Sequence, residues 1–294
     1  MGNATRSSSS GRVDREHLEC VQGRFSFALR SPDEGTPEYK TGYDIPFVEH
    51  DVTIRNARPI VDELSLDKEG FTLIQHKMSC LNEHDPQVLR KKYLEELVPF
   101  VKDYFNASWV ATADVGGVTL RSLGGDSFGG TADGAGGEAG KLPVRNFGAG
   151  FAHIDYSPVA GPMIAARDNQ LQSIEIRSYS RLIILQTWRA ISSPPQDFPL
   201  AFCDGSSISN ADLVDTPQTR YGATIRAWIP HYNPSHRWYY FPDMTSDELV
   251  LFKGYDSAMH YHPWSAHSAF DNRRACPNAR PRESIETRVY VYYE

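Results

Sequence analysis

The sequence predicts a mainly β fold, a sandwich, barrel or jelly roll with flanking helices. Short β-like runs dominate the chain from Trp109 onward, at 145–156, 173–192, 221–230, 236–242, 248–253 and 284–293. One clear amphipathic helix precedes these runs. Many short strands after one or two helices are typical of such β architectures and not of a doubly wound α/β sheet.

The elements before Trp109 follow from local signals. The first residues, 1–20, are polar and rich in serine near their start, so we expect a disordered leader. Short alternating segments within 24–80, such as 70–74, indicate strands separated by Pro and Gly turns. The helix begins with Asp85 as N-cap and Pro86 in the first turn. Its apolar stripe contains Leu89, Tyr93, Leu97, Val101 and Phe105. We expect this helix to lie on a sheet.

Length and composition fit one soluble domain, which we place at 21–294. The 294 residues are 40% hydrophobic, enough to bury a core of that size. A net charge of −7 disfavours nucleic acid as a partner, because that affinity rests on clustered Lys and Arg. We find no membrane-spanning run and no signal sequence. The cysteines lack C-x-x-C spacing, which favours free thiols and a cytoplasmic location.

A glycine-dense stretch, 116–140, could suggest a nucleotide site. GAGGEA at 134–139 fits a loose G-x-G-x-x-A, but no buried strand precedes it and no clear helix follows. A P-loop requires Ser or Thr where Leu142 stands. We therefore expect a mobile loop, which ends just before the next motif and could act as a lid there.

The segment FAHIDYSP, 151–158, places an imidazole and a carboxylate side by side. In an extended chain residues i and i+2 point the same way, so His153 and Asp155 share a face. A buried carboxylate there needs a partner, which is either an arginine, a backbone network or a metal ion. A metal needs a third ligand, for which HYHPWSAHSAF offers His260, His262 and His267.

The last segment, RESIETRVYVYY, alternates strictly. Arg282, Ser284, Glu286 and Arg288 lie on one face, and apolar residues lie on the other. We interpret the polar face as the lining of a cavity, with Glu286 as an ion-pair partner that gives Arg288 a structural role. A His-x-Asp segment, a distant His and a late Arg-x-Ser strand are the parts of a 2-His-1-carboxylate iron site with a dicarboxylate pocket.

The chain resembles the fungal oxygenases related to gibberellin desaturase, a family that also includes the component associated with cephamycin methoxylation. The resemblance covers roughly residues 22–294. Its motifs are HIDYS at 153–157, WR at 188–189, PLAFCD at 199–204, HRWYYFPDMTSDELVLFKGYDS at 236–257, HSAFDN at 267–272 and RESIETR at 282–288. It implies a double-stranded β-helix, the cupin-like jelly roll, and a non-haem Fe(II)- and 2-oxoglutarate-dependent oxygenase that oxidises a small secondary metabolite with O2.

The resemblance also implies residue roles. The expected iron ligands and catalytic residues are His153, Asp155 and His267. Arg282 and Ser284 would bind the distal carboxylate of 2-oxoglutarate, where a planar guanidinium matches a carboxylate. Gln186 is a further cosubstrate candidate, although such sequences usually carry Asn at that place. Candidates to line the substrate cavity are Trp188, Arg189, Tyr239 and Trp264.

Several outcomes stay open at this point. Hydroxylation, desaturation and ring or peroxide formation all fit, whereas a carboxylate at Asp155 disfavours halogenation, which needs an open metal position. Two other classes are a metal-binding jelly roll without oxygenase activity and a structural or interaction protein of the same fold. The expected partners are the small-molecule substrate and O2, with neither nucleic acid nor membrane, and a homodimer is a further possibility.

Overall fold

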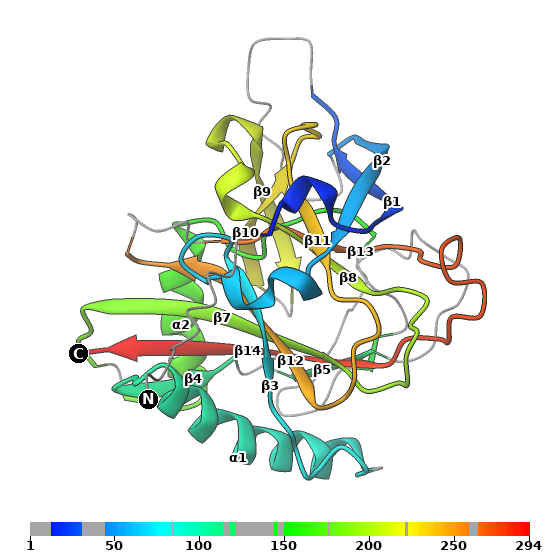
Figure 1. Cartoon of the computed structure of the whole chain (residues 1–294). Coiled ribbons are helices and arrows are strands. Elements are labelled where there is room, and N and C mark those ends of the chain that lie inside the picture. Colours follow the sequence, from blue (N-terminus) through cyan, green and yellow to red (C-terminus); the bar gives the residue numbers. More distant parts are fainter. Residues whose placement is uncertain are drawn as a thin grey trace, which may run out of the picture.

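The structure of the protein is a computed structural model that describes residues 13–30, 45–83, 85–113, 118–121, 144–145, 150–175, 177–220, 223–258 and 264–294. Strands dominate it, and helices flank them (Figure 1). The glycine-dense stretch 116–140, apart from 118–121, lies outside the described residues, as do His260 and His262.

The main sheet contains seven strands in the order β3-β12-β7-β14-β5-β6, with β4 paired to β14. These strands are β3 (Phe71–Gln75), β4 (Trp109–Thr112), β5 (Val118–Arg121), β6 (Val144–Arg145), β7 (Arg181–Ala190), β12 (Glu248–Asp256) and β14 (Ser284–Tyr293). Strand β14 begins and ends where the alternating pattern predicts. Antiparallel pairing of β14 with β7 along their full length makes these two strands the centre of the sheet.

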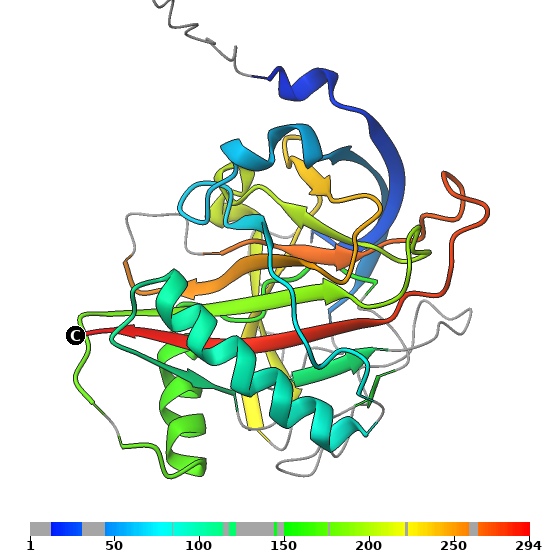
Figure 2. The ribbon, with the colours of Figure 1, turned by 60° about the horizontal axis from the view of Figure 1, so that its bottom comes forward.

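Helix α1 (Pro86–Tyr104) covers the outer face of the main sheet. The Asp85 side chain accepts hydrogen bonds from the backbone N–H groups of Gln87 and Val88, as expected of an N-cap. The buried stripe of the helix packs with apolar side chains of the sheet, among them Leu185, Leu251 and Val289. Figure 2 shows the helix lying across β7 and β14. The predicted helix and its position on a sheet are both confirmed.

The second sheet has the order β1-β2-β11-β8-β13, and a separate two-stranded ribbon joins β9 to β10. These strands are β1 (Cys20–Ala28), β2 (Phe47–Asn56), β8 (Leu200–Cys203), β9 (Leu213–Arg220), β10 (Ala223–Pro230), β11 (Trp238–Tyr240) and β13 (His267–Ala269). Side chains from both sheets form one core, in which Phe71 and Phe252 of the main sheet pack on Phe202 of the second. The predicted mainly β jelly roll is thereby confirmed.

Two segments differ from the prediction. In the run 145–156, the described residues are Arg145, at the end of β6, and 150–156, which pair only through isolated bridges, so 150–156 is not a regular strand. Helix α2 (Ala160–Leu171) was not predicted, because Gly161 is a weak helix former and the N-cap residue, Val159, has no side chain that can cap the helix. Gly161 packs against the Tyr255 ring, where an added Cβ would lie only 2.6 Å from a ring atom.

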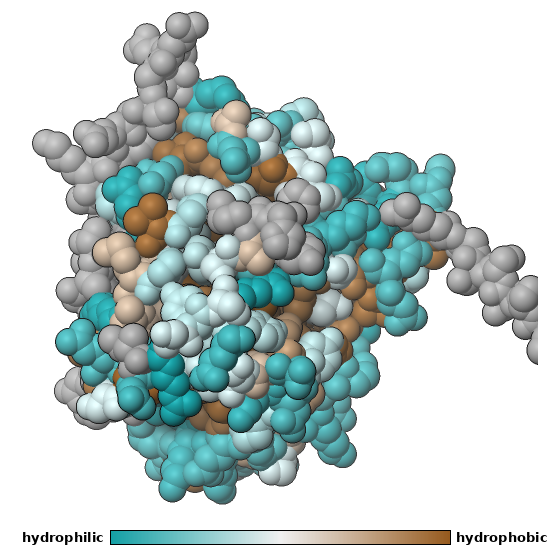
Figure 3. Space-filling model, turned by 90° about the vertical axis from the view of Figure 1, so that its left-hand side faces the viewer, coloured by the Kyte–Doolittle hydropathy of each residue, from teal (hydrophilic) through white to brown (hydrophobic). Residues whose placement is uncertain are grey.

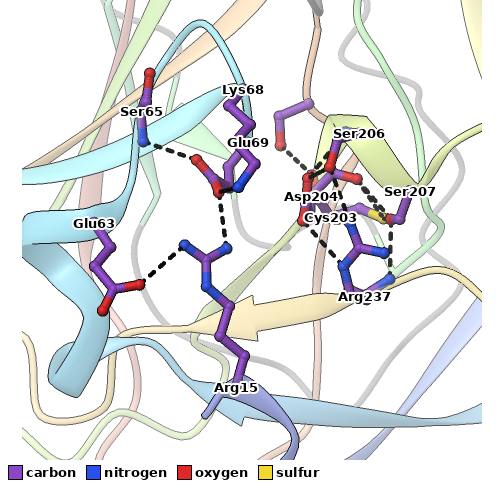
Figure 4. Close-up of polar contacts among 11 residues, drawn as sticks. Arg15, Glu63, Ser65, Lys68, Glu69, Cys203, Asp204, Ser206, Ser207 and Arg237 are labelled. Atoms are coloured by element: carbon purple, nitrogen blue, oxygen red, sulfur yellow. Dashed lines mark hydrogen bonds and ion pairs between the residues drawn. The ribbon is translucent and has the colours of Figure 1, made fainter. Parts of the chain in front are cut away.

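The end of the predicted leader contacts the body of the protein. Residues 13–20 include the short helix η1 (Arg15–His17) and the start of β1. Arg15 donates to the fully buried Glu69 at 2.8 Å, and the backbone N–H of Ser65 donates to the same carboxylate at 2.9 Å (Figure 4). This ion pair therefore joins η1 to the turn that precedes β3.

The same turn supports the segment that leads to His267. Gly70 has a φ of +85°, and an added Cβ would lie 2.6 Å from the carbonyl oxygen of Trp264. The neighbouring Ser265 hydroxyl donates to the carbonyl of Cys203 at 2.9 Å, at the end of β8. Next to it, Asp204 accepts two bonds from Arg237 (Figure 4). The turn before β3 and the end of β8 thus contact the backbone that precedes His267, and Arg237 in turn binds the residue that follows β8.

The remaining short helices are η2 (Arg58–Glu63), η3 (Gly205–Ser207) and η4 (Asn210–Asp212). Within the described part of the chain, neither α1 nor α2 has the length and apolar character needed to span a lipid bilayer. Cys20, Cys80, Cys203 and Cys276 are all free thiols. On the face turned to the viewer in Figure 3, hydrophobic residues form separate patches among hydrophilic ones.

Candidate metal centre

The fold brings His153, Asp155 and His267 together. One ligand atom from each lies within 4.8 Å of the others, and all three residues are buried. Backbone pairing causes this proximity, because the N–H of His153 donates to the carbonyl of His267 at 3.1 Å and the reverse bond measures 3.0 Å. Among the described residues, this is the one group of three His, Cys, Asp or Glu side chains with such spacing.

Both imidazoles are oriented by backbone carbonyls. Nδ1 of His153 donates to the carbonyl of Phe151 at 3.0 Å, and Nδ1 of His267 donates to that of Ser265 at 3.4 Å. A carbonyl can only accept, so each ring carries its proton on Nδ1 and leaves the lone pair of Nε2 available. Burial, followed by the nearby His153, lowers the pKa of His267 to about 3. Both features suit a neutral metal ligand.

The alternation predicted for this segment is confirmed. Ala152 and Ile154 are fully buried on the opposite side, in the core that contains Trp238 and Phe25. Although strand pairing is limited to single bridges here, the extended backbone still separates the two faces. His153 and Asp155 therefore point away from that core, toward His267.

The two oxygens of Asp155 have different surroundings. Oδ1 lies 3.4 Å from Nε2 of His153. Oδ2 accepts from Nε2 of Gln186 at 2.7 Å and from Nε and Nη2 of Arg288 at 2.9 and 2.6 Å. Arg288 also pairs with Glu286 at 2.8 Å, as the sequence predicts. The contact with Asp155 was missed, although the alternation of β14 already placed Arg288 on the cavity face.

Arg282 and Ser284 lie at the other end of this face of β14. The guanidinium of Arg282 is buried, donates to the carbonyl of Phe198 at 2.6 Å and lies 5.8 Å from the Trp188 ring centre. The Ser284 hydroxyl is buried and has no hydrogen-bond partner among the described residues. A buried hydroxyl without a partner is costly, so this position is suited to an oxygen-bearing ligand.

The four candidates for the substrate cavity lie in different places. Trp188 is on the inner face of β7, opposite Glu286. Arg189 is on the outer face, where it donates to the Tyr93 hydroxyl at 3.2 Å under helix α1. Tyr239 packs in the core between the sheets, and Trp264 packs on Trp228 in the core that contains Ile154. Trp188 is the candidate that contacts Arg282, and it shares the core between the sheets with Tyr239.

Comparison with known proteins adds independent findings. A family model described as "Oxidoreductase/YMDC permease-like domain" matches residues 21–292. The chain is 27% identical over 273 residues to the Fe(II)/2-oxoglutarate-dependent dioxygenase nvfI of Aspergillus novofumigatus, which covers 89% of this chain and 93% of the relative. It is 28% identical over 257 residues to the hydroxylase/desaturase efuI of Hormonema carpetanum, covering 83% of each.

A solved structure agrees with the sequence comparison. The iron and alpha-ketoglutarate-dependent endoperoxidase NvfI, in a structure described as a different conformation, superposes with a TM-score of 0.73 at 25% identity. The match covers 93% of this chain and 97% of the other. The chain thus belongs to the oxidoreductase/YMDC permease-like domain family, and the enzyme class predicted from its sequence, an Fe(II)- and 2-oxoglutarate-dependent oxygenase, is confirmed.

Proposed function

We propose that His153, Asp155 and His267 bind Fe(II) and that the protein oxidises a small secondary metabolite with 2-oxoglutarate and O2. One observation carries this proposal: one ring nitrogen from each of two imidazoles and a carboxylate oxygen lie within 4.8 Å of one another, and each Nδ1 contacts a backbone carbonyl. Two histidines and one carboxylate on one face of a metal are the donor set of non-haem Fe(II) oxygenases. The residues present therefore fit the metal.

Arg282 and Ser284 are proposed to bind the distal carboxylate of 2-oxoglutarate. The Ser284 hydroxyl, which no described residue binds, and the buried Arg282 guanidinium support this assignment, because together they offer neutral and charged donors to one carboxylate. Glu286 lies on the same face of β14, and its ion pair with Arg288 offsets its negative charge. Without that pair, Glu286 would repel a dicarboxylate.

The chemistry is divided between the bound groups and the chain. When bound, Fe(II) and 2-oxoglutarate would supply O2 activation and the oxidising power for the substrate, with 2-oxoglutarate converted to succinate and CO2. His153 and His267 would donate nitrogen lone pairs, and buried aromatic residues such as Trp188 limit water near the site. The names of the relatives include a hydroxylase/desaturase and an endoperoxidase, so we propose an outcome within this range.

The test is an anaerobic titration of the purified protein with Fe(II) and 2-oxoglutarate. The proposed enzyme should develop the visible charge-transfer band of a chelated keto acid, and His267→Ala should not. Arg181→Gln, at a distant ion pair with Asp256, should keep the band. Bound metal without the band would indicate a metal-binding jelly roll, and no tight metal would indicate a structural protein.

We further propose a cytoplasmic location and a closer kinship with the gibberellin-desaturase-related oxygenases. Four free thiols support the location, and the motifs HIDYS and RESIETR support the kinship. Assembly as a homodimer stays a prediction, which sedimentation of the purified protein would test.

A further inference from the structure

We propose that Arg288 and Gln186 are positioning residues that bind one oxygen of Asp155 and so present only the other oxygen to the metal. This inference rests on the proposed function, because it concerns how the proposed Fe(II) ligand is oriented. The sequence associates Gln186 with the cosubstrate and Arg288 with stability alone, whereas this inference gives both side chains a role in orienting Asp155.

Three N–H donors converge on the same atom. Oδ2 of Asp155 accepts from Nε2 of Gln186 at 2.7 Å, from Nη2 of Arg288 at 2.6 Å and from Nε of Arg288 at 2.9 Å. Oδ1 instead faces the imidazole, 3.4 Å from Nε2 of His153. A carboxylate oxygen with three donors has little capacity left for a cation, so the geometry assigns metal binding to Oδ1.

The sheet places both donors by register. Arg288 of β14 and Gln186 of β7 are directly opposite each other in the antiparallel ladder, and both lie on the inner face. Side chains opposite each other in such a pair are close enough to share one acceptor. Since β7 and β14 are the central strands, the backbone positions of both residues are fixed by pairing on both sides.

Gly254 on the neighbouring strand β12 makes room for the glutamine. An added Cβ at this position would lie 2.9 Å from Oε1 of Gln186 and 2.8 Å from the Tyr156 ring. The Gln186 amide oxygen extends into the space that the glycine leaves. Gly254 therefore leaves room for the orientation in which Gln186 donates to Asp155.

Glu286 in turn orients Arg288. Its carboxylate lies 2.8 Å from Nη2, the same nitrogen that donates to Asp155 at 2.6 Å. The guanidinium is thus shared between two buried carboxylates, and its plane is fixed by contacts on both sides. Rotation of Asp155 to offer both oxygens to a metal would break the three bonds to Oδ2.

The experiment measures Co(II) binding to the full chain under anaerobic conditions, by calorimetry and by visible absorption. We expect Arg288→Gln to weaken Co(II) binding by about 10- to 100-fold, as for other residues that orient metal ligands. We also expect a changed Co(II) absorption spectrum, because the released carboxylate can bind through both oxygens. Gln186→Ala should show the same changes, more weakly, and it covers the case in which Arg288→Gln does not fold.

Arg181→Gln is the matched control. Arg181 also lies on β7 and also makes a two-point contact with a buried carboxylate, donating to Asp256 at 2.9 and 2.6 Å. This variant should leave both the Co(II) affinity and the spectrum unchanged.

The outcomes separate positioning from simple electrostatics. Removing a positive charge near a cation should by itself tighten binding. Equal or tighter Co(II) binding in Arg288→Gln and Gln186→Ala, with the wild-type spectrum, would overturn the positioning role. A wild-type protein that binds no Co(II) would overturn the proposed function together with it, so the two failures are distinct.

Discussion

Each face of the main sheet carries one arginine whose bonds can be compared, the partly buried Arg288 on the inner face and the fully buried Arg189 on the outer face, and the two are bound in opposite ways. On the inner face, Arg288 contacts the carboxylates of Asp155 and Glu286. On the outer face, Arg189 is fully buried, and its described contacts are with uncharged groups. These groups are the Tyr93 hydroxyl, Nδ1 of His76 and the carbonyls of His76 and Ser246.

The difference shows what each face contributes. Arg189 joins β7 to helix α1 through Tyr93 and to two loops through backbone carbonyls, so its bonds stabilise the packing of the outer layer. Arg288 joins β14 to a proposed metal ligand. Substitutions on the inner face should therefore change metal and cosubstrate binding, whereas those on the outer face should change the free energy of unfolding.

The largest effect should follow from removing a proposed ligand on the inner side. We expect His153→Ala, Asp155→Ala and His267→Ala each to reduce activity by about 1,000-fold or more, because the three ligands act as one unit. Circular dichroism should show a retained fold, and metal analysis should show lost Fe(II). Full activity of His267→Ala would instead move the third ligand to His260 or His262.

Arg189→Gln should have the next largest effect, on stability. Four contacts to a fully buried guanidinium would be lost, which leaves buried acceptors without donors, so we expect a loss of about 3 kcal/mol or more. Urea unfolding measures this loss. Lys91→Gln on the exposed side of α1 is the control, with an expected change within about 0.5 kcal/mol.

Measuring Co(II) affinity in Arg189→Gln as well as in Arg288→Gln tests whether the two arginines have different roles. The folded fraction of Arg189→Gln should bind Co(II) as tightly as the wild type does. A large loss of Co(II) affinity in this variant, with little loss of stability, would show that the two faces are not functionally separate.

A smaller effect should distinguish Arg288, which lies in β14, from Arg282, which precedes that strand. Arg282→Gln should weaken 2-oxoglutarate binding by roughly 10- to 100-fold with metal affinity nearly unchanged, because it removes one charge-assisted pair. The measurement is a titration of the charge-transfer band with 2-oxoglutarate. If Arg288→Gln loses the cosubstrate and Arg282→Gln retains it, the anchor must be reassigned to Arg288.

The sequence was most informative where one local rule determined the outcome. Alternation gave β14 with both of its ends and the shared face of His153 and Asp155, and capping gave the start of α1. The strand predicted over 145–156 was wrong for 150–156, because these residues pair through isolated bridges, which no propensity encodes.

The parts that sequence could not predict depend on register between distant strands. Arg288 reaches Asp155 because β14 and β7 align it opposite Gln186, and periodicity along one strand contains no such information. In the same way, Arg189 and Trp188 are neighbours in sequence but lie on opposite faces, so a motif that includes both does not place both in the site. Helix α2 depends on the close packing of Gly161 on Tyr255, which is a tertiary contact.

The smallest expected effect is a pH dependence of the free energy of unfolding, caused by His76 on the outer face of the sheet. Burial, followed by the charge of Arg189, lowers the pKa of His76 from 6.5 to about 4. Between these two values the unfolded chain binds more protons than the folded one, so the free energy of unfolding should fall as the pH falls through this window. Below about pH 4 both states are protonated at His76, and this contribution stays constant.

Comparison of the wild type with His76→Asn isolates this contribution. The pKa of His267 is lowered from 6.5 to about 3, so His267 also lowers the free energy of unfolding as the pH falls between these values. This contribution is present in both proteins. Urea unfolding at pH 7, 6, 5 and 4 should therefore give a shallower slope for His76→Asn, because the asparagine can still accept a bond from Arg189 but cannot be protonated. Equal slopes in the two proteins would mean that the folded protein tolerates a charged His76 beside Arg189, and the outer face would then contribute no pH dependence.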